Sequence, residues 1–274
     1  MLGDLPYLDF LDTFYPRDEI LKASKSKSLT PYGLFYVYTV QQLKPFFQHF
    51  GRSYEIAYYE KIANDVRKNI ISKCYDSSKG LFADNPEKEF FSQHAHVMEM
   101  LTSCVPPTQQ KVVMQKVLGD TALIPVSLYF KFYQFEALKQ AGMGEDILNE
   151  LGDWKAMLNS GMNTFSEWLK DPRSECYSWS AYPAYYFLNT IAGIEPAKPG
   201  FTSIKIQPRL GSLKMLTAQV PHPDGIIKTM YKKINDNTWN IQIELPPAIK
   251  GVFIWKEKIY PLNGTNKVCE FLLR

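Results

Sequence analysis

The sequence predicts an α+β chain of two domains, a helical domain followed by an antiparallel β-sandwich. Apolar residues recur at helical spacing from about Leu34 to Ala192. From Ser203 onward the apolar period changes to two, as in half-buried strands. The Pro- and Gly-rich stretch at 195–200 separates the two patterns. We therefore predict a helical domain over 1–197 and a β-sandwich over 198–274.

The helical domain is predicted to consist of helices in pairs, because short polar or Pro- and Gly-containing breaks separate its amphipathic segments. The aromatic-rich segment from Tyr129 to Leu138 is apolar on most sides, which indicates a helix buried inside the domain. The predicted helices cover 32–50, 54–74, 91–103, 108–117, 126–142, 145–158 and 178–192.

The sandwich is predicted from many short alternating segments joined by tight turns. In the first segment Ile204 and Ile206 face one way and Lys205 faces the other. Turn signals such as His222-Pro-Asp-Gly225 and Asn263-Gly264 separate the later segments. The predicted strands cover 203–207, 215–220, 226–234, 239–245, 252–255, 258–262 and 267–272.

Composition excludes several classes of protein. The 274 residues are 45% hydrophobic, which is enough for a buried core, and a formal net charge of +3 with mixed signs forms no basic stripe for nucleic acid. No apolar run reaches the roughly 20 residues of a membrane span, and the amino terminus lacks a signal-like pattern. The four cysteines form no CxxC pair, so neither a zinc site nor a disulfide scaffold is predicted, and no cofactor is expected.

One connection between predicted helices is unusually rich in residues that bind sugars. Residues 161–183 contain two Glu, an Asp, an Arg, two Trp and two Tyr. Aromatic rings stack against sugar rings, and charged groups hold sugar hydroxyls. The alternative is a solvated loop whose aromatic residues anchor it to the core.

Four segments in and after this connection occur in the order and spacing of a known family. Asn163-Thr-Phe-Ser-Glu-Trp168 is similar to the Thr-Thr-x-x-Glu motif of the α-L-rhamnosidases of glycoside hydrolase family 78. Residues 181–196 resemble the next helix of that family and its Ala-Gly-Ile-x-Pro ending. Residues 199–208 resemble its Pro-Gly-Phe-x-x-Ile-x-Ile-x-Pro entry into a terminal β-domain, and 222–226 resemble its Pro-x-Gly-x-Ile hairpin. The resemblance covers at least residues 120–262.

The resemblance implies a partial (α/α)₆ toroid before the sandwich and an inverting glycosidase that releases terminal L-rhamnose, with Glu167 as general base. Such an enzyme also needs a general acid, about 6.5–9.5 Å from the base. The acid motif of the family combines an Arg-Asp-Glu element with Trp-x-Gly-Asp. Pro16-Arg-Asp-Glu19 lacks the second part, so we do not assign Glu19. We expect the acid and the first helices of the toroid to lie upstream of this chain, since seven predicted helices fall short of twelve.

The resemblance also suggests residues that contact the sugar. Leu8-Asp-Phe10 looks like the later Asp-Trp motif of the family, with Phe in place of Trp. Tyr177 stands where the family commonly has His, which puts substrate preference and activity in question. His94 and His96 lie on different faces of a helix, so a shared metal is not predicted, and a structural role is favoured for both. The candidate sugar contacts are Asp9, Phe10, His94, Trp168, Glu175, Tyr177 and Trp179.

Two hypotheses remain open for the function. The chain is the carboxy-terminal portion of a rhamnosidase-like hydrolase that is inactive alone, or a carbohydrate-binding or scaffold protein derived from the same toroid. Another toroidal glycosidase or a polysaccharide lyase is a weaker alternative, because one helical architecture hosts several chemistries. The expected partner is a rhamnose-containing carbohydrate. An incomplete toroid would expose apolar faces, so we also expect self-association or association with upstream helices.

Overall fold

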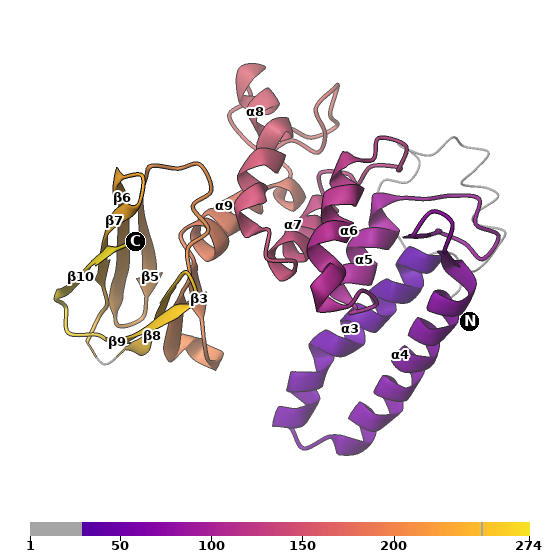
Figure 1. Ribbon diagram of the computed structural model, residues 1–274, viewed down its shortest axis with the longest axis horizontal. Coiled ribbons are helices and arrows are strands. Elements are labelled where there is room, and N and C mark those ends of the chain that lie inside the picture. Colours follow the sequence, from indigo (N-terminus) through magenta and orange to yellow (C-terminus); the bar gives the residue numbers. More distant parts are fainter. Residues whose placement is uncertain (1–28, 248) are drawn as a thin grey trace. The chain divides into compact units, whose positions relative to one another are not determined.

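The computed structural model describes residues 29–247 and 249–274. The chain forms two compact units, Met1–Met143 and Gly144–Arg274 (Figure 1). The boundary that the sequence predicts at 197/198, between a helical domain and a β-sandwich, lies within the second unit. The predicted Asp9 and Phe10 lie outside the described residues.

The first unit is built from antiparallel helices. The helices α3 (Thr30–His49) and α4 (Ser53–Cys74) form a long hairpin (Figure 1). A short hairpin of β1 (Tyr75–Asp76) and β2 (Leu81–Phe82) follows. The chain then forms the three helices α5 (Gln93–Leu101), α6 (Pro107–Gly119) and α7 (Lys131–Gln140).

Helix α5 is the buried centre of this unit. It packs against α3, α6 and α7, and all of its residues from His94 to Leu101 are buried. Its start is fixed by Ser92, whose hydroxyl accepts a hydrogen bond from the amide of Ala95 (3.3 Å) and donates one to Asp84 (2.8 Å). A helix without a solvent-facing side must accommodate any polar residue inside the core, and α5 contains three: His94, His96 and Glu99.

His96 and Glu99 form a buried pair on α5. Nδ1 of His96 lies 3.1 Å from Oε1 of Glu99, one helical turn away. Both side chains are almost fully buried, at 0% and 3% exposure. Burial raises the pKa of the Glu99 carboxyl above its ordinary value, and the neighbouring His96 opposes that rise.

The helical part of the second unit is irregular. A 3₁₀ helix, η1 (Gly144–Leu151), leads directly into α8 (Gly152–Asn159). The region predicted as one helix over 178–192 is a 3₁₀ turn, η2 (Ser178–Ser180), a short helix, α9 (Pro183–Tyr186), and a π-helical turn, η3 (Phe187–Ile191). Pro183 lacks the backbone N–H that a continuous helix requires, so α9 begins there.

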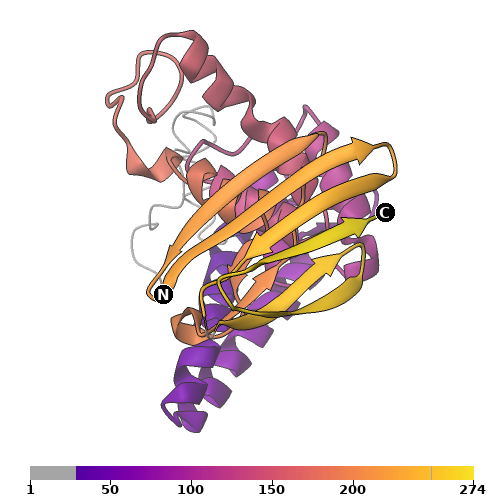
Figure 2. The same cartoon turned by 90° about the vertical axis from the view of Figure 1, so that its left-hand side faces the viewer.

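Two four-stranded sheets follow. One has the order β10-β7-β6-β5, and Figure 2 shows its long strands lying side by side. The other has the order β3-β4-β8-β9, in which β4 and β8 run parallel and the remaining neighbours antiparallel. The strands are β3 (Ile194–Pro196), β4 (Ser203–Ile206), β5 (Met215–His222), β6 (Gly225–Asn235), β7 (Thr238–Glu244), β8 (Lys250–Trp255), β9 (Lys258–Asn263) and β10 (Val268–Leu273).

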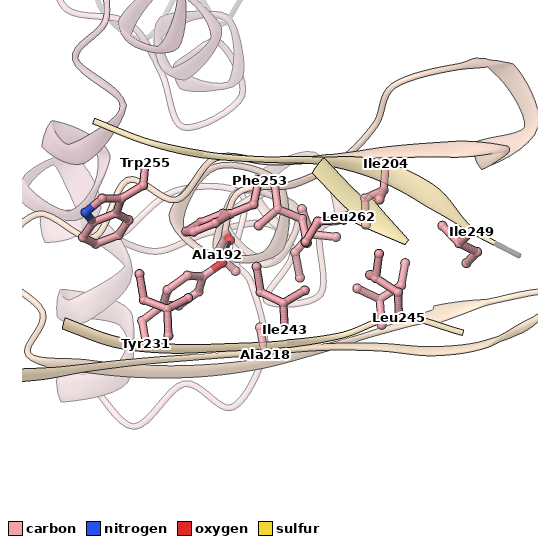
Figure 3. Packing of buried hydrophobic residues seen from close by; sticks show 14 of the residues in the cluster. Ala192, Ile204, Ala218, Tyr231, Ile243, Leu245, Ile249, Phe253, Trp255 and Leu262 are labelled. Carbon is pink, nitrogen blue, oxygen red and sulfur yellow. Dashed lines mark hydrogen bonds between the residues drawn. The ribbon is translucent and has the colours of Figure 1, made fainter. Parts of the chain in front are cut away.

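The inner faces of the two sheets meet in one apolar core (Figure 3). Ile204 of β4 and Phe253 of β8 face Tyr231 of β6 and Ile243 of β7, and all four are fully buried. The Tyr231 hydroxyl donates a hydrogen bond to the carbonyl oxygen of Ala192 (2.8 Å), so its burial leaves no polar atom unpaired. The period-two pattern thus corresponds to alternating inward and outward side chains.

The Pro- and Gly-rich stretch that separates the two predicted domains overlaps a strand, β3. Strand β3 pairs antiparallel with β4, and Glu195 lies opposite Lys205 in the register. Their side chains form an ion pair of 3.3 Å. The second sheet therefore begins at Ile194, before the Pro- and Gly-rich turn of residues 197–200.

We predict that Glu99 makes the stability of the first unit depend on pH. A carboxyl whose pKa is raised in the folded state binds its proton more tightly there than in the unfolded chain. Its stabilising contribution is present below the ordinary value of 4.5 and is lost as pH rises through the raised value. The variant Glu99→Gln should therefore gain stability relative to the wild type as pH rises, by at most about 1.4 kcal/mol per pH unit.

Urea unfolding at a series of pH values above 4.5 measures this difference, with the exposed Glu87→Gln as the control. The control should follow the wild-type curve. A constant offset between Glu99→Gln and the wild type across the series would contradict the prediction.

Candidate functional site

The loop between α8 and η2 folds back on itself. The amide of Glu167 donates to the carbonyl oxygen of Ser174 (2.9 Å), and the amide of Tyr177 donates to that of Phe165 (2.7 Å). The hydroxyl of Thr164 donates to the carbonyl oxygen of Glu175. These bonds place residues 164–167 beside 174–177, so the side chains of the two halves of the loop come together.

Buried polar contacts anchor this folded loop to α8. The hydroxyl of Ser180 donates to the carbonyl oxygen of Ser166 (2.7 Å), and Nε1 of Trp154 on α8 donates to the carbonyl oxygen of Ser180 (2.8 Å). Ser166, Ser180 and Trp154 are all buried. The backbone next to Glu167 is therefore held by groups that cannot exchange these bonds for water.

The carboxylate of Glu167 is buried and paired with Arg173. Its Oε2 accepts a hydrogen bond from Nε of Arg173 (3.0 Å), and its Oε1 accepts one from Nη2. Only 1% of the Glu167 side chain is exposed, against 70% of that of Arg173. A buried carboxylate needs such a partner, because an unpaired buried charge is strongly destabilising.

The ring of Trp168 lies next to this ion pair. The guanidinium carbon of Arg173 lies 5.1 Å from the ring centroid, a cation–π arrangement. Nε1 of Trp168 donates to the carbonyl oxygen of Asp171 (3.2 Å), which fixes the ring across the turn. Asp171 has a positive φ of 52°, so the chain reverses sharply there.

Tyr177 and Trp179 add two more rings. Their centroids are 5.2 Å apart in an edge-to-face arrangement, and 44% of Trp179 is exposed. Burial raises the pKa of the Tyr177 phenol, and the nearby Glu167 carboxylate raises it further, while Arg173 opposes both effects. The phenol is therefore a neutral hydrogen-bond donor at working pH.

The other candidate residues lie elsewhere. Glu175 is in the loop, with an exposed side chain. His94 is on α5 of the first unit, buried, with its ring 4.7 Å from that of Phe130. Among residues 29–247 and 249–274, no group of three or more His, Cys, Asp or Glu could hold a metal ion. Within the same residues, none of the helices combines the length and the apolar character needed to cross a bilayer.

Arg173 is a site residue that the sequence motifs do not identify. It is one of the charged residues of the loop, but nothing in the motif indicates that it pairs with Glu167. The Asp171-Pro-Arg173 sequence is a turn signal, and a reversal at that point would return Arg173 toward Glu167. The pairing itself depends on the backbone bonds between the two halves of the loop.

Comparison with known proteins agrees with the sequence motifs on the fold and on the terminal domain. Residues 193–253 match the family model of the bacterial α-L-rhamnosidase C-terminal domain. The structure resembles the family 78 rhamnosidase of Bacillus sp. GL1, with a TM-score of 0.74 and 20% identity over 84% of this chain and 26% of that one. The resemblance stated from sequence motifs is confirmed, as is the predicted fold class of a partial toroid followed by a sandwich.

Two further solved structures have the same fold. The α-L-rhamnosidase of Aspergillus terreus matches with a TM-score of 0.73 and 14% identity over 87% of this chain and 29% of that one. The α-L-rhamnosidase of Streptomyces avermitilis, solved in complex with L-rhamnose, matches with a TM-score of 0.65 and 15% identity. The match covers 81% of this chain and 22% of that one. No curated protein matches the sequence. This chain thus spans about a quarter of the length of the rhamnosidases it resembles.

We predict that Glu167→Gln lowers the pKa of Tyr177 toward its ordinary value of 10.0. The substitution removes a negative charge that disfavours the phenolate, and it frees Arg173, whose positive charge favours the phenolate. Both effects act in the same direction. The measurement is a pH titration by NMR of chain labelled with ¹³C at the phenolic carbon of tyrosine, with Tyr177 assigned by Tyr177→Phe. The exposed Glu145→Gln is the control, and an unchanged or higher pKa in Glu167→Gln would contradict the geometry.

Proposed function

We propose that this chain is the carboxy-terminal portion of an inverting rhamnosidase-like glycoside hydrolase, in which Glu167 is the general base. The observation that carries the proposal is the folded loop of residues 164–179. It gathers one buried carboxylate, one cation and three aromatic rings in the part of the sequence that resembles the rhamnosidase base motif. The relationship in fold to the family 78 enzymes supports the same assignment.

In the proposed reaction Glu167 removes a proton from water as the water oxygen bonds to the anomeric carbon. The glycosidic bond breaks, and the leaving oxygen receives a proton from a second carboxyl on the opposite face of the sugar. In this proposal that acid is supplied by residues upstream of the chain. Glu167 ends the step protonated and returns its proton to solvent.

The aromatic residues of the loop are proposed to hold the sugar. Trp168 and Trp179 offer ring faces for stacking, and the neutral phenol of Tyr177 offers a hydrogen-bond donor beside the base. Glu175 is exposed and is proposed to bind sugar hydroxyls. Asp9, Phe10 and His94 are also proposed to contact the sugar.

One observation favours a binding or scaffold protein instead. Both oxygens of Glu167 accept hydrogen bonds from Arg173, and the side chain is almost wholly covered. A carboxylate in that arrangement could serve only to close the loop. The protein would then bind a rhamnose-containing glycan without turnover.

The two functions differ in the outcome for Glu167→Gln. In the full-length protein, hydrolysis of p-nitrophenyl α-L-rhamnoside should fall by about 10²–10⁴-fold, the usual contribution of a general base. Binding of L-rhamnose, measured by calorimetry, should persist, because the amide keeps the shape of the side chain. The exposed Glu145→Gln is the control and should keep wild-type turnover. Turnover that survives in Glu167→Gln excludes the base role, and binding without turnover in the wild type supports the scaffold.

We also propose that the α3–α4 hairpin associates with further protein, either a second copy or upstream helices. Large apolar side chains are exposed along it, including Phe46 (58%), Phe50 (60%) and Tyr54 (78%). The rings of Phe46 and Phe50 lie 4.7 Å apart, so these two form a continuous surface. Contiguous exposed apolar surface usually marks an interaction site.

Sedimentation velocity over a range of concentrations tests this association. The wild-type chain should sediment faster as concentration rises, and the double variant Phe46→Ser, Phe50→Ser should shift toward the monomer. Leu158→Ser, at a separate exposed position (71%), is the control and should behave as the wild type. A wild-type chain that is monomeric at every concentration, alone and after addition of the upstream polypeptide, would exclude the proposed association.

A further inference from the structure

Arg173 contacts Glu167 through two hydrogen bonds, one to each carboxylate oxygen. Nε bonds to Oε2 at 3.0 Å and Nη2 bonds to Oε1. Two parallel N–H···O bonds restrain rotation of the carboxylate in a way that one bond does not. The orientation of the Glu167 oxygens therefore depends on Arg173.

The pair is asymmetric in burial. The Glu167 side chain is 1% exposed, whereas that of Arg173 is 70% exposed. Without a cation nearby, a buried carboxylate takes up a proton or turns toward solvent. The guanidinium stays protonated at any working pH, so Arg173 cannot itself take a proton from water. Any contribution of Arg173 to the reaction is made through Glu167.

The guanidinium is held from a second side. The Trp168 ring lies 5.1 Å from its central carbon, and that ring is itself fixed by its bond to the carbonyl oxygen of Asp171. The backbone bond from Glu167 to Ser174 brings the residue next to Arg173 against Glu167. The loop thus places the guanidinium between a ring face and the carboxylate.

We infer that Arg173 is the positioning residue of Glu167, holding its carboxylate ionised and in one plane so that a water can lose a proton to it. This inference rests on the proposed base role of Glu167. Each carboxylate oxygen has a second lone pair that the Arg173 bonds leave available. A water that donates to such a lone pair leaves both Arg173 bonds, and with them the orientation of the carboxylate, in place.

Three variants of the full-length protein test the inference. Arg173→Met removes the charge and keeps much of the length of the side chain. Arg173→Lys restores the charge as a single point without the planar fork. Arg52→Met is the matched control, because Arg52 is also mostly exposed and also forms an ion pair, with Glu55.

Kinetics should separate a positioning role from a structural one. We expect Arg173→Met to lower kcat by about tenfold or more, within the range of acid–base effects, with little change in KM. A carboxylate that is no longer oriented loses reactivity and not substrate affinity, so the loss should fall on kcat and leave KM and Tm close to the wild-type values. Arg173→Lys should recover part of kcat, and Arg52→Met should match the wild type in both kcat and KM.

A second measurement needs no turnover and uses this chain alone. The sequence has six arginines, so the Nε–H signals of an arginine-labelled ¹⁵N sample are few. The Arg173 signal, assigned by Arg173→Lys, should exchange slowly with solvent, and Glu167→Gln should speed that exchange by about tenfold, as expected when a protecting bond is lost. The Arg52 signal should not respond to Glu167→Gln.

The outcomes distinguish this inference from the proposed function. If Glu167→Gln keeps turnover, or the wild type has none, the base role fails and the inference fails with it. If Glu167→Gln is inactive but Arg173→Met keeps the wild-type kcat, only the inference fails. A loss of kcat in Arg173→Met that is matched by a lower Tm and not rescued by Arg173→Lys would show a structural role instead. An exchange rate of the Arg173 Nε–H that is unchanged in Glu167→Gln would overturn the pairing itself.

Discussion

The ion pair between Arg173 and Glu167 is the constraint on which the loop of residues 164–179 depends. Removing a carboxylate from water costs far more than a single neutral hydrogen bond returns, so a Glu167 side chain that is 1% exposed requires a charged, two-pronged partner. The chain supplies it by reversing at Asp171 and pairing Glu167 with Ser174 along the backbone. Trp168 and Tyr177 are then placed beside the same carboxylate, so the aromatic and acidic groups form one cluster.

The rest of the second unit keeps that loop in place. The hydroxyl of Ser180 on η2 donates to the carbonyl oxygen of Ser166 in the loop, and Trp154 on α8 donates to the carbonyl oxygen of Ser180. The turn η3 contacts both η1 and β3. The two sheets bury a core of aliphatic and aromatic side chains, in which the Tyr231 hydroxyl is paired with the Ala192 carbonyl oxygen. A loop that carries polar groups is more sharply positioned when the elements on either side of it are rigid.

Fold and function are separate conclusions for this chain. The resemblance to solved rhamnosidases at 14–20% identity establishes the architecture, and one architecture hosts many chemistries. The functional proposal rests on the residues of the loop. Access of water to the covered Glu167 carboxylate distinguishes the two proposed functions. A general base in a hydrolase must be reached by water, whereas a structural ion pair in a scaffold protein need not be.

Periodicity in the sequence determined most of the elements. The helix predicted over 54–74 is Ser53–Cys74, and the strand predicted over 258–262 is Lys258–Asn263, because local hydrophobic spacing decides which side chains an element buries. The sequence also placed Glu167 and the aromatic residues in one loop. Tertiary structure alone decided that β3 extends the second sheet and that Arg173 lies against Glu167. Strand pairing and side-chain ion pairs depend on which distant segments meet, and spacing along the chain does not specify those contacts.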